Sequence, residues 1–407
     1  MKVSKAGLLY LILLIPFLEP GYVTVTSIAP YFSMARKMFF CISVVMIFLT
    51  FIQKRDKRSF GFIAIVYAYF GVLGLLTIIS PTGDFNSFRN MAIVDISICN
   101  LSFLWLRKSY KTFISYLLFY IEVLLIINLL TIVFIPQGLY SVQRYTGYFL
   151  GYDNTHIRWM IPGLLLSLLW GYIQEKEGKW RPKLIAVHPR TLVLFAVCVG
   201  HVMISFSSTS IVGLAVFAIL VFLLNKKDTN KKRKLYSFKY VYYISVIGTA
   251  IVVLMANSYM YNLLLAIGAF FGKNMEAVRL KLWRAAWQSI VENPWLGVGV
   301  ENSLTTMMKM TGSDFQGQSA HNYILNTLYQ CGIVGFIFFG NIYRVIGKKV
   351  SSIKGSLIGS YFCIFYIVIA VMGLTEPQHG AVCLYTIWAL SYFCDLIEED
   401  LSVAKEG

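Results

Sequence analysis

Long apolar segments are the feature that most restricts what this chain can fold into. Stretches such as 59–80, 112–135 and 356–374 run for about 20 residues with almost no charged side chains. A helix of that length matches the hydrocarbon thickness of a bilayer. Such segments recur along all 407 residues, and the mean hydropathy is +0.67. A soluble protein could not bury so much apolar surface, so the sequence predicts many membrane spans rather than several soluble domains.

The fold class that follows is all-α, a polytopic membrane protein with about twelve transmembrane helices in one integral domain over residues 1–407. The expected spans are 6–24, 34–53, 59–80, 88–106, 112–135, 157–173, 191–207, 210–225, 238–257, 321–344, 356–374 and 381–397. The first of them is not expected to be a cleavable signal peptide. It lacks a small-residue cleavage site, and Glu19-Pro20 interrupts it.

The net charge of +17 has an ordinary explanation in such a chain. With a cytoplasmic N-terminus, about 26 of the 36 Lys and Arg residues fall in inside segments and about 10 fall outside. This asymmetry predicts that both termini are cytoplasmic, and no nucleic-acid partner is expected. The seven cysteines form no CxxC pair and lie mostly in apolar stretches. They are typical of small core residues rather than of a disulfide framework or a metal site.

A long loop precedes a late apolar segment. Residues 258–320 form a predicted large extracytoplasmic loop. Near 277–292 its apolar residues recur at helical spacing, with Arg279 and Arg284 on opposite flanks of the apolar face. Asn293-Pro294 ends this helix, because a residue before proline avoids helical angles. An amphipathic helix with tryptophans and arginines is suited to the outer membrane–water boundary.

The chain has no motif of a soluble enzyme. It contains no Walker loop, no GxGxxG, no HExxH, and no acidic pair of the kind that holds a nucleotide sugar through a metal. A glycosyl donor would therefore be bound without nucleotide and without metal, and no cofactor is expected. A lipid-linked substrate meets both conditions.

Several basic groups are predicted on the outer face, against the positive-inside trend. They could bind phosphate, for which the planar fork of arginine is suited, or they could be solvated loop charges and contacts to lipid headgroups. The second reading applies most readily to Lys273, Lys281 and Arg284. The full set is Arg144, Arg158, Lys273, Arg279, Lys281, Arg284 and His321.

The end of the long loop carries the most specific pattern. The chain reads His321-Asn322, then nine residues, then Gly332-Ile333-Val334-Gly335. This arrangement resembles the O-antigen polymerase and O-antigen ligase family of integral membrane glycosyltransferases. Two further stretches carry the same resemblance: Arg279, Trp283 and "NPWLGVG" at 293–299, and Arg144, Gly147 and Asn154 before the sixth span. One stretch departs from it, because many relatives have an arginine among the serines where Ser207–Ser210 has none.

The resemblance implies a GT-C-like membrane enzyme of the bacterial cytoplasmic membrane, acting on the outer face on undecaprenyl-diphosphate-linked oligosaccharide. It implies that His321 is catalytic, either as a base or as a phosphate ligand. It also implicates substrate-binding residues, and our candidates are Arg144, Arg279, Asn322 and Arg284. Gly332 and Gly335 are expected to pack against a neighbouring helix.

Three functions remain open at this stage. A polymerase would transfer the glycan to the sugar hydroxyl of another lipid-linked repeat unit, for capsule, exopolysaccharide or O-antigen. A ligase would transfer it to lipid A-core or to protein. A flippase for lipid-linked oligosaccharides is the alternative from another class, although the large loop and the His-Asn pattern favour an enzyme. Membrane lipids, a flippase and chain-length regulator proteins are further candidate partners.

Five other ionisable residues could contribute to a substrate path. Asp95, Glu122 and His201 lie within predicted spans, where ionisable groups are costly and usually face the protein interior. They could equally make polar contacts between helices. Glu376 and His379 lie in a short outer loop on the same side as His321 and are candidates for sugar contacts.

Overall fold

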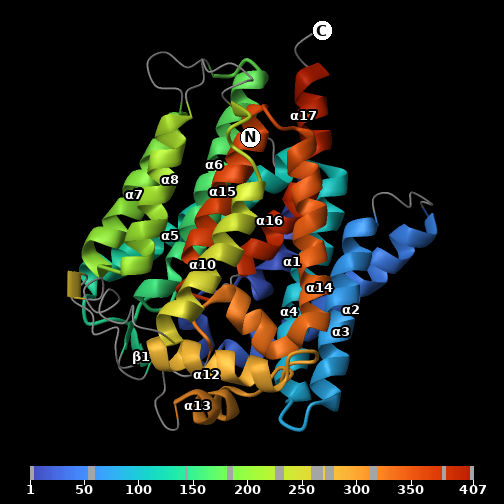
Figure 1. The fold of residues 1–407 in the computed structure, drawn as a ribbon. Coiled ribbons are helices and arrows are strands. Elements are labelled where there is room, and N and C mark those ends of the chain that lie inside the picture. Colours follow the sequence, from blue (N-terminus) through green and yellow to red (C-terminus); the bar gives the residue numbers. More distant parts are fainter. Residues whose placement is uncertain are drawn as a thin grey trace.

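The computed structural model describes residues 4–53, 60–142, 145–180, 187–224, 233–257, 269–270, 279–311, 319–377 and 382–403. Nearly all of its regular structure is helical (Figure 1). The longer helices of the first half are α1 (Lys5–Leu14), α2 (Ala29–Gln53), α3 (Gly61–Ile79), α4 (Phe85–Lys108), α5 (Tyr110–Phe134) and α6 (Ile157–Lys176). Those of the second half are α7 (Pro189–Ser205), α8 (Ser208–Leu223), α10 (Lys239–Asn257), α12 (Arg279–Glu292), α13 (Ser303–Thr311), α14 (Tyr323–Ser352), α15 (Leu357–Met372), α16 (Val382–Tyr392) and α17 (Cys394–Val403).

The short elements lie in the connections. They are the 3-10 helices η1 (Ile15–Phe17), η2 (Gly21–Val25) and η3 (Asp153–Thr155), and the strands β1 (Tyr140–Val142) and β2 (Tyr145–Gly147). The two strands pair antiparallel, with Tyr140 opposite Gly147. This hairpin and η3 connect α5 to α6.

The prediction of an all-α membrane protein is confirmed. Within the described residues, α2, α3, α5, α10 and α14 are long and apolar enough to cross a bilayer. Shorter apolar helices accompany them, among them α7, α8 and α15. Each of the twelve predicted spans contains a helix, although the count of twelve spans and their direction stay predictions.

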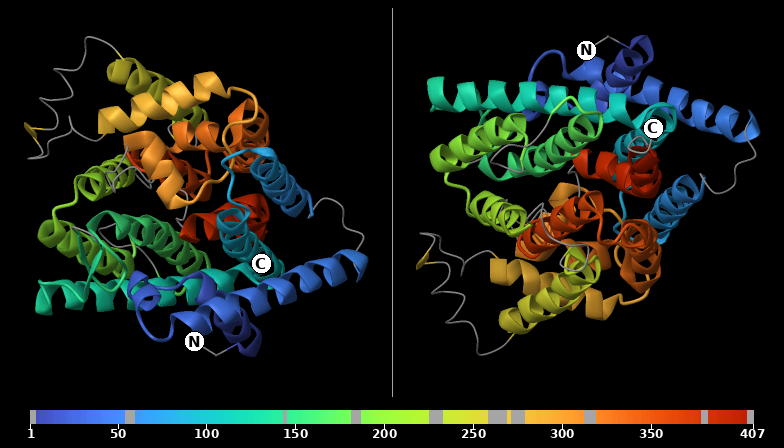
Figure 2. Two further views of the ribbon diagram at one scale, coloured as in Figure 1. Left: turned by 90° about the horizontal axis from the view of Figure 1, so that it is seen from below. Right: turned by 90° about the horizontal axis from the view of Figure 1, so that it is seen from above.

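The bundle has a protected centre and an exposed edge. In the end views of Figure 2, α15 and α16 lie inside a ring of other helices, and nearly all of their described side chains are buried. α2 lies at the edge instead, where only 11% of the residues in its most apolar 18-residue stretch are buried. Large apolar side chains of α2, such as Met34 and Phe48, are therefore left to face lipid.

The expected continuous span 321–344 is wrong in one respect, because α14 is sharply bent. Gly332 has φ 55° and ψ −165°, which are not helical angles. The ring of Tyr323 packs 5.3 Å from that of Phe339. In a straight helix these residues would lie about 24 Å apart along the axis. The segment Tyr323–Cys331 therefore folds back against the segment that follows Gly332, and only the latter can cross the bilayer.

The stretch "NPWLGVG" holds this bend closed. The N–H groups of Ile333 and Val334 begin the second segment and donate to the carbonyls of Pro294 (2.8 Å) and Trp295 (3.1 Å). Val298 and Gly299 satisfy carbonyls at the end of the first segment in the same way, with bonds of 2.9 Å each to Tyr329 and Gln330. Free helix ends inside a membrane protein need such partners. Two sequence motifs thus form one hydrogen-bonded unit.

The bend also explains why glycine stands at positions 332 and 335. A Cβ on Gly332 would lie 2.4 Å from the Trp295 carbonyl oxygen, and one on Gly335 would lie 2.3 Å from the Cβ of Cys331. Gly332 therefore permits close approach to the chain after α12 at the bend of α14 itself, rather than to a neighbouring helix as predicted. A Cβ on Gly335 would also lie 3.3 Å from Leu76 Cδ1 of α3, so this glycine does face a neighbouring helix as predicted.

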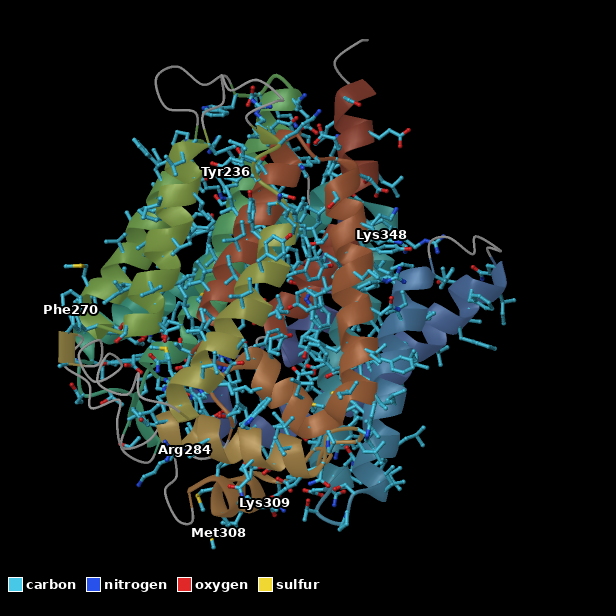
Figure 3. The ribbon with its side chains drawn as sticks, in the orientation of Figure 1. Tyr236, Phe270, Arg284, Met308, Lys309 and Lys348 are labelled. Atoms are coloured by element: carbon cyan, nitrogen blue, oxygen red, sulfur yellow. The ribbon has the colours of Figure 1, made fainter. Side chains whose placement is uncertain are left out.

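One end of the molecule gathers the segments predicted to be extracytoplasmic. The turn between α3 and α4 bonds to the chain after α12, with Ser80 Oγ donating to Val298 O (2.5 Å) and Asp84 N–H to Val300 O (2.7 Å). Figure 3 shows Arg284 and Lys309 of α12 and α13 at this end, with Lys348 of α14 far above them. We call it the α12 end.

Candidate functional site

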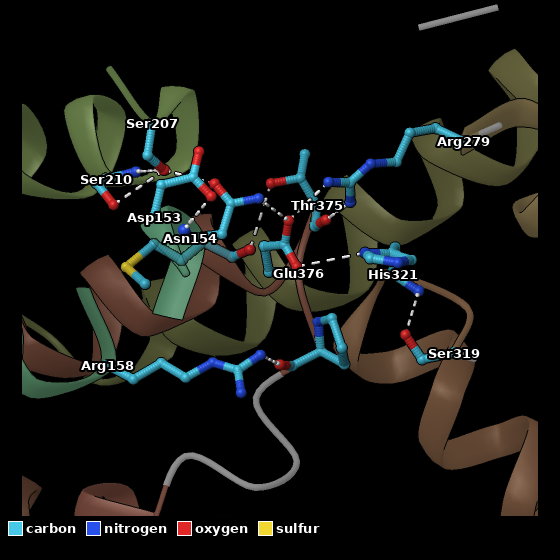
Figure 4. A network of polar contacts seen from close by, with 12 residues as sticks. Asp153, Asn154, Arg158, Ser207, Ser210, Arg279, Ser319, His321, Thr375 and Glu376 are labelled. Atoms are coloured by element: carbon cyan, nitrogen blue, oxygen red, sulfur yellow. Dashed lines mark hydrogen bonds and ion pairs between the residues drawn. The ribbon is translucent and has the colours of Figure 1, made fainter. Parts of the chain in front are cut away.

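Side chains from distant parts of the chain converge on Glu376, in the short loop after α15 (Figure 4). Its carboxylate is only 4% exposed. Oε1 accepts hydrogen bonds from Arg279 Nη2 (2.6 Å) and Asn154 Nδ2 (3.4 Å), and Oε2 lies 3.3 Å from His321 Nδ1. Glu376 thereby connects three elements: Arg279 begins α12, His321 directly precedes α14 and its cap, and Asn154 lies in η3.

Arg279 is held by its own helix and by the same loop. It is the first residue of α12, whose buried face includes Leu280, Trp283 and Ala286. Its Nη1 donates to the carbonyl of Thr375, while Nη2 contacts Glu376. The guanidinium carries five N–H donors, so these two bonds leave others for a ligand. The side chain is 20% exposed, so a ligand could reach it.

His321 has an unusual backbone conformation. Its φ is +44°, and of the described residues other than glycine just one more, Phe206, has a positive φ. Such a conformation is uncommon outside glycine and is frequent at functional sites, where surrounding contacts enforce it. His321 N–H lies 3.4 Å from Ser319 Oγ, and the side chain is 22% exposed.

Asn322 is used inside the protein. It caps α14, with Oδ1 accepting from Leu325 N–H (2.9 Å) and from Thr249 Oγ1 (3.3 Å). Its Nδ2 donates to Leu374 O (3.1 Å), and the residue is fully buried. This geometry does not favour the predicted substrate contact. Asn322 instead fixes the loop that carries Glu376 relative to His321.

The serine-rich stretch at the start of α8 orients Asn154. Ser207 Oγ donates to Asn154 Oδ1 at 2.5 Å, and Ser210 Oγ donates to Ser207 Oγ at 3.0 Å. With its oxygen occupied in this way, Asn154 turns its amide N–H₂ toward Glu376. The serines that replace the family's arginine therefore take part in the network through Asn154.

Arg158 approaches the same loop from α6. Its Nη2 donates to the carbonyl of Pro377 at 3.2 Å, and the residue is half-buried. Arg158 and Arg279 thus hold backbone carbonyls on either side of Glu376, and both keep further donors for an anionic ligand.

The charges around Glu376 determine its protonation state. Burial by itself raises the pKa of this carboxyl, but the charge of Arg279 and the hydrogen bond and charge of His321 outweigh burial and hold the pKa well below its usual range. A carboxylate only accepts hydrogen bonds. His321 Nδ1 therefore carries the proton it shares with Glu376, which in the neutral ring leaves Nε2 with a lone pair.

Not all predicted site residues reach this network. Arg144, Lys273 and His379 lie outside the described residues. Arg284 donates through Nε (3.1 Å) and Nη2 (2.7 Å) to the carbonyl of Ala256 in the last turn of α10. The structure thus uses Arg284 to cap a helix C-terminus, which does not favour the predicted substrate-binding role. Lys281 is exposed.

The ionisable residues within spans make contacts between or within helices. Glu122 pairs with Arg190 at 2.6 Å, and His201 Nδ1 contacts Val197 O, one turn earlier in α7, at 2.9 Å. Asp95 is buried and bonded to Tyr385. These contacts favour the reading of polar contacts over that of an acceptor path.

Sequence reasoning named Glu376 only as a candidate sugar contact and named Asn154 only within a motif. It named Ser207 only as part of a stretch that departs from the family pattern, and it named Arg158 only as an outer basic group, without its position beside the loop. The sequence did hold a signal for the role of Glu376. It is a carboxylate in a short outer loop, and an acidic residue among several outer arginines is expected to form an ion pair with one of them.

Comparison with known families agrees with this geometry. Residues 192–340 match the family model described as O-antigen ligase. This match supports the predicted resemblance to the O-antigen ligase and polymerase family. The match covers Arg279, His321 and the bend of α14, while Asn154, Arg158 and Glu376 lie beyond its limits. No curated protein matches the chain.

The match to this family model supports a membrane enzyme of the glycosyltransferase type, with lipid-linked oligosaccharide as the substrate class. Among the described residues, no group of three or more His, Cys, Asp or Glu is placed to hold a metal ion. Arg279 shares the carboxylate of Glu376 with His321.

Proposed function

We propose that the protein is a polysaccharide polymerase of the bacterial cytoplasmic membrane. It transfers a glycan from undecaprenyl diphosphate to a sugar hydroxyl of another lipid-linked repeat unit, on the extracytoplasmic face and without a metal. The observation that carries this proposal is the meeting of Arg279, His321 and Glu376 in a partly exposed cluster. The cluster joins donors for a diphosphate to an oriented histidine.

The reaction requires charge stabilisation and a proton acceptor. The acceptor oxygen attacks the anomeric carbon, the bond from that carbon to the diphosphate oxygen breaks, and undecaprenyl diphosphate leaves. The unused N–H groups of Arg279 and Arg158 stabilise the charge that develops on the diphosphate, a task for which preorganised donors are effective. His321 Nε2 takes the proton of the acceptor hydroxyl, and Glu376 stabilises the resulting imidazolium.

An apolar cavity supports a route for the lipid tail of the donor. It has a volume of about 150 Å³ and lies between α10, α14 and α15. Tyr323 and Ile324, which almost directly follow His321, line it, and so do Tyr242 and Val246 on the lipid-facing surface of α10. A tail seated there would leave its diphosphate beside His321.

The choice of polymerase over ligase rests on the greater variety of family members that join repeat units. Purified protein given only lipid-linked repeat units tests it. A polymerase makes longer lipid-linked chains from this single substrate. A product that forms only after lipid A-core or an acceptor protein is added would instead identify a ligase.

The first prediction concerns the two central side chains. His321→Ala and Arg279→Ala should each reduce polymer about a hundredfold or more, because each removes a group used in the transition state. Arg279→Lys should restore little, because lysine lacks the planar fork that contacts Thr375 O and Glu376 together. Polymer is measured in cells and with purified protein at equal membrane abundance.

Lys281→Ala is the matched control. Lys281 is exposed on the same helix, two residues from Arg279, so polymer should stay within about twofold of the wild type. Polymer of normal length and amount from His321→Ala would refute the proposed role of His321.

The second prediction is independence from divalent metal. Arginines take the place of a cation at the diphosphate, so elongation by purified protein should continue in excess chelator. The rate should stay within about twofold, since no step loses its charge stabilisation. A complete loss that magnesium or manganese restores would contradict the role given to the arginines.

A further inference from the structure

A hollow lined by positive charge lies between α2 and α4, outside the candidate site. Its volume is about 410 Å³. Arg36 and Lys37 of α2 and Arg89 of α4 line it, and no acidic residue does. Arg36 is paired with Glu19. Lys37 and Arg89 are exposed, so they can offer their charge to a ligand.

This hollow lies at the α12 end of the molecule. α4 starts at Phe85, directly after the turn that bonds to Val300, and Arg89 is in its first turns. In the predicted topology, about 10 of the 36 Lys and Arg residues are outside. Arg36, Lys37 and Arg89 are three of these. Their grouping around one hollow gives a reason for basic residues on the face where they are usually scarce.

The same face of α2 leads to a second hollow, which is apolar, and we call this face with its two hollows the α2 groove. Val44, Phe48 and Phe51 follow Lys37 at intervals of 7, 11 and 14 residues, and Ser33 precedes Lys37 by four, so all five residues lie on one stripe of the helix. Val44, Phe48 and Phe51 line the second hollow, which has a volume of about 270 Å³ and lies between α2 and α3. The side chains lining it are apolar, apart from the hydroxyl of Tyr67. The stripe therefore runs from a basic outer end to an apolar inner end.

The length of the stripe points to a particular kind of lipid. Ser33 and Phe51 are 18 residues apart, which is about 27 Å along a helix. Half of the bilayer hydrocarbon is only about 15 Å thick. A tail that follows the stripe from Lys37 to Phe51 runs about 21 Å along the helix, which is more than the depth that the chains of a phospholipid fill in one leaflet. α2 is at the edge of the bundle, so the groove is open to the bilayer.

We propose that this groove, formed by the Ser33–Phe51 stripe of α2 with α3 and α4, binds a polyprenyl phosphate. The phosphate lies among Arg36, Lys37 and Arg89, and the chain follows Val44 and Phe48 to the apolar hollow between α2 and α3. This binding claim does not depend on the proposed function. If that function holds, the groove is a second lipid-phosphate site, able to hold a lipid-linked molecule while another occupies the site at His321.

The headgroup contact is tested with a double variant. Undecaprenyl phosphate is titrated into full-length protein in nanodiscs, in the Arg279→Ala background so that the candidate active site contributes less. Lys37→Ala with Arg89→Ala should weaken binding about tenfold or more, because two charged donors are lost. Lys281→Ala with Arg344→Ala removes the same charge from exposed positions elsewhere and should leave binding unchanged. Equal binding by the two double variants would overturn the proposal.

The tail contact is tested by chain length. Ala64 is an exposed residue of α3 that lines the inner hollow, so Ala64→Trp should fill it. This variant should bind undecaprenyl phosphate several-fold more weakly and farnesyl phosphate, whose short chain ends above the hollow, as well as its parent does. Unchanged binding of undecaprenyl phosphate would overturn the predicted path of the chain. Displacement of undecaprenyl phosphate by an equal concentration of phosphatidylglycerol would show a general anionic-lipid surface and would also overturn the proposal.

Discussion

At the scale of single residues, Glu376 links the groups proposed to act on substrate. It contacts both Arg279 and His321, and its own loop is held by Asn322 and Arg158. The carboxylate therefore has two effects. It sets which nitrogen of His321 carries the proton, and it keeps Arg279 turned toward the loop.

The third prediction concerns this carboxylate. Glu376→Gln should lower turnover about a hundredfold or more, because an amide can offer its N–H₂ to His321 and so permit the wrong tautomer. The pKa of Glu376 is held below its usual range, so the substitution removes a charge present throughout the neutral range. Its contribution to stability is present above the unfolded pKa near 4.5 and is lost only in strong acid, as the pH falls through the lower folded value.

Turnover of purified Glu376→Gln is compared with that of Glu292→Gln. Glu292 is an exposed carboxylate at the end of α12 that contacts only Gln288 among the described residues. The control should be nearly silent. Normal turnover of Glu376→Gln would show that the carboxylate has no role in the reaction and only forms an ion pair.

The sequence could predict His321 and Arg279 because each belongs to a short local motif. It could not predict in the same way that Glu376 contacts both of them. Glu376 is 55 residues from His321 and 97 from Arg279, so only tertiary packing brings the three together. The structural contacts that Asn322 and Arg284 make could not be predicted for a similar reason. A polar side chain that could bind substrate could equally satisfy a helix end, and the sequence does not say which helix end is near.

At the scale of elements, the bend of α14 is the feature that apolar patterning missed. Apolar residues continue through Gly332 without a break, and hydropathy alone reads the segment as one span. The spacing of His321 and Gly332 instead measures the length of a short helix that runs from the site to the bend. The partner of that bend, "NPWLGVG", lies more than 30 residues earlier in the chain.

The fourth prediction concerns this bend. Gly332→Ala should destabilise the protein by about 2–4 kcal/mol, because φ +55° with ψ −165° suits only glycine and the new methyl group would meet Trp295 O. Gly71→Ala is the matched control. Nothing lies within 4 Å of a Cβ there, and alanine is the better helix former. Thermal unfolding in detergent should show a lower midpoint for Gly332→Ala only, and equal midpoints would mean that the bend adapts without cost.

At the scale of the whole molecule, the distribution of charge assigns a direction to the bundle. The apolar segments could be predicted because each must match the membrane, and a helix lies in every one of them. The direction rests on a different property, the excess of Lys and Arg in alternate connections. The proposed reaction depends on it, because Arg279 at the start of α12 places the cluster at the α12 end.

The fifth prediction is that the α12 end is extracytoplasmic and both termini are cytoplasmic. Cys41 is the one exposed cysteine, and the other six are buried. A Cys41→Ser variant should therefore react little with maleimide and can serve as the parent for labelling. In intact cells a membrane-impermeant maleimide should label Gln288→Cys, on the exposed side of α12. It should label Lys348→Cys, toward the other end of the bundle (Figure 3), only after the inner membrane is opened. The reverse pattern would place His321 and its arginines in the cytoplasm, where an extracytoplasmic polymerase could not use them, and the topology and the proposed function would fail together.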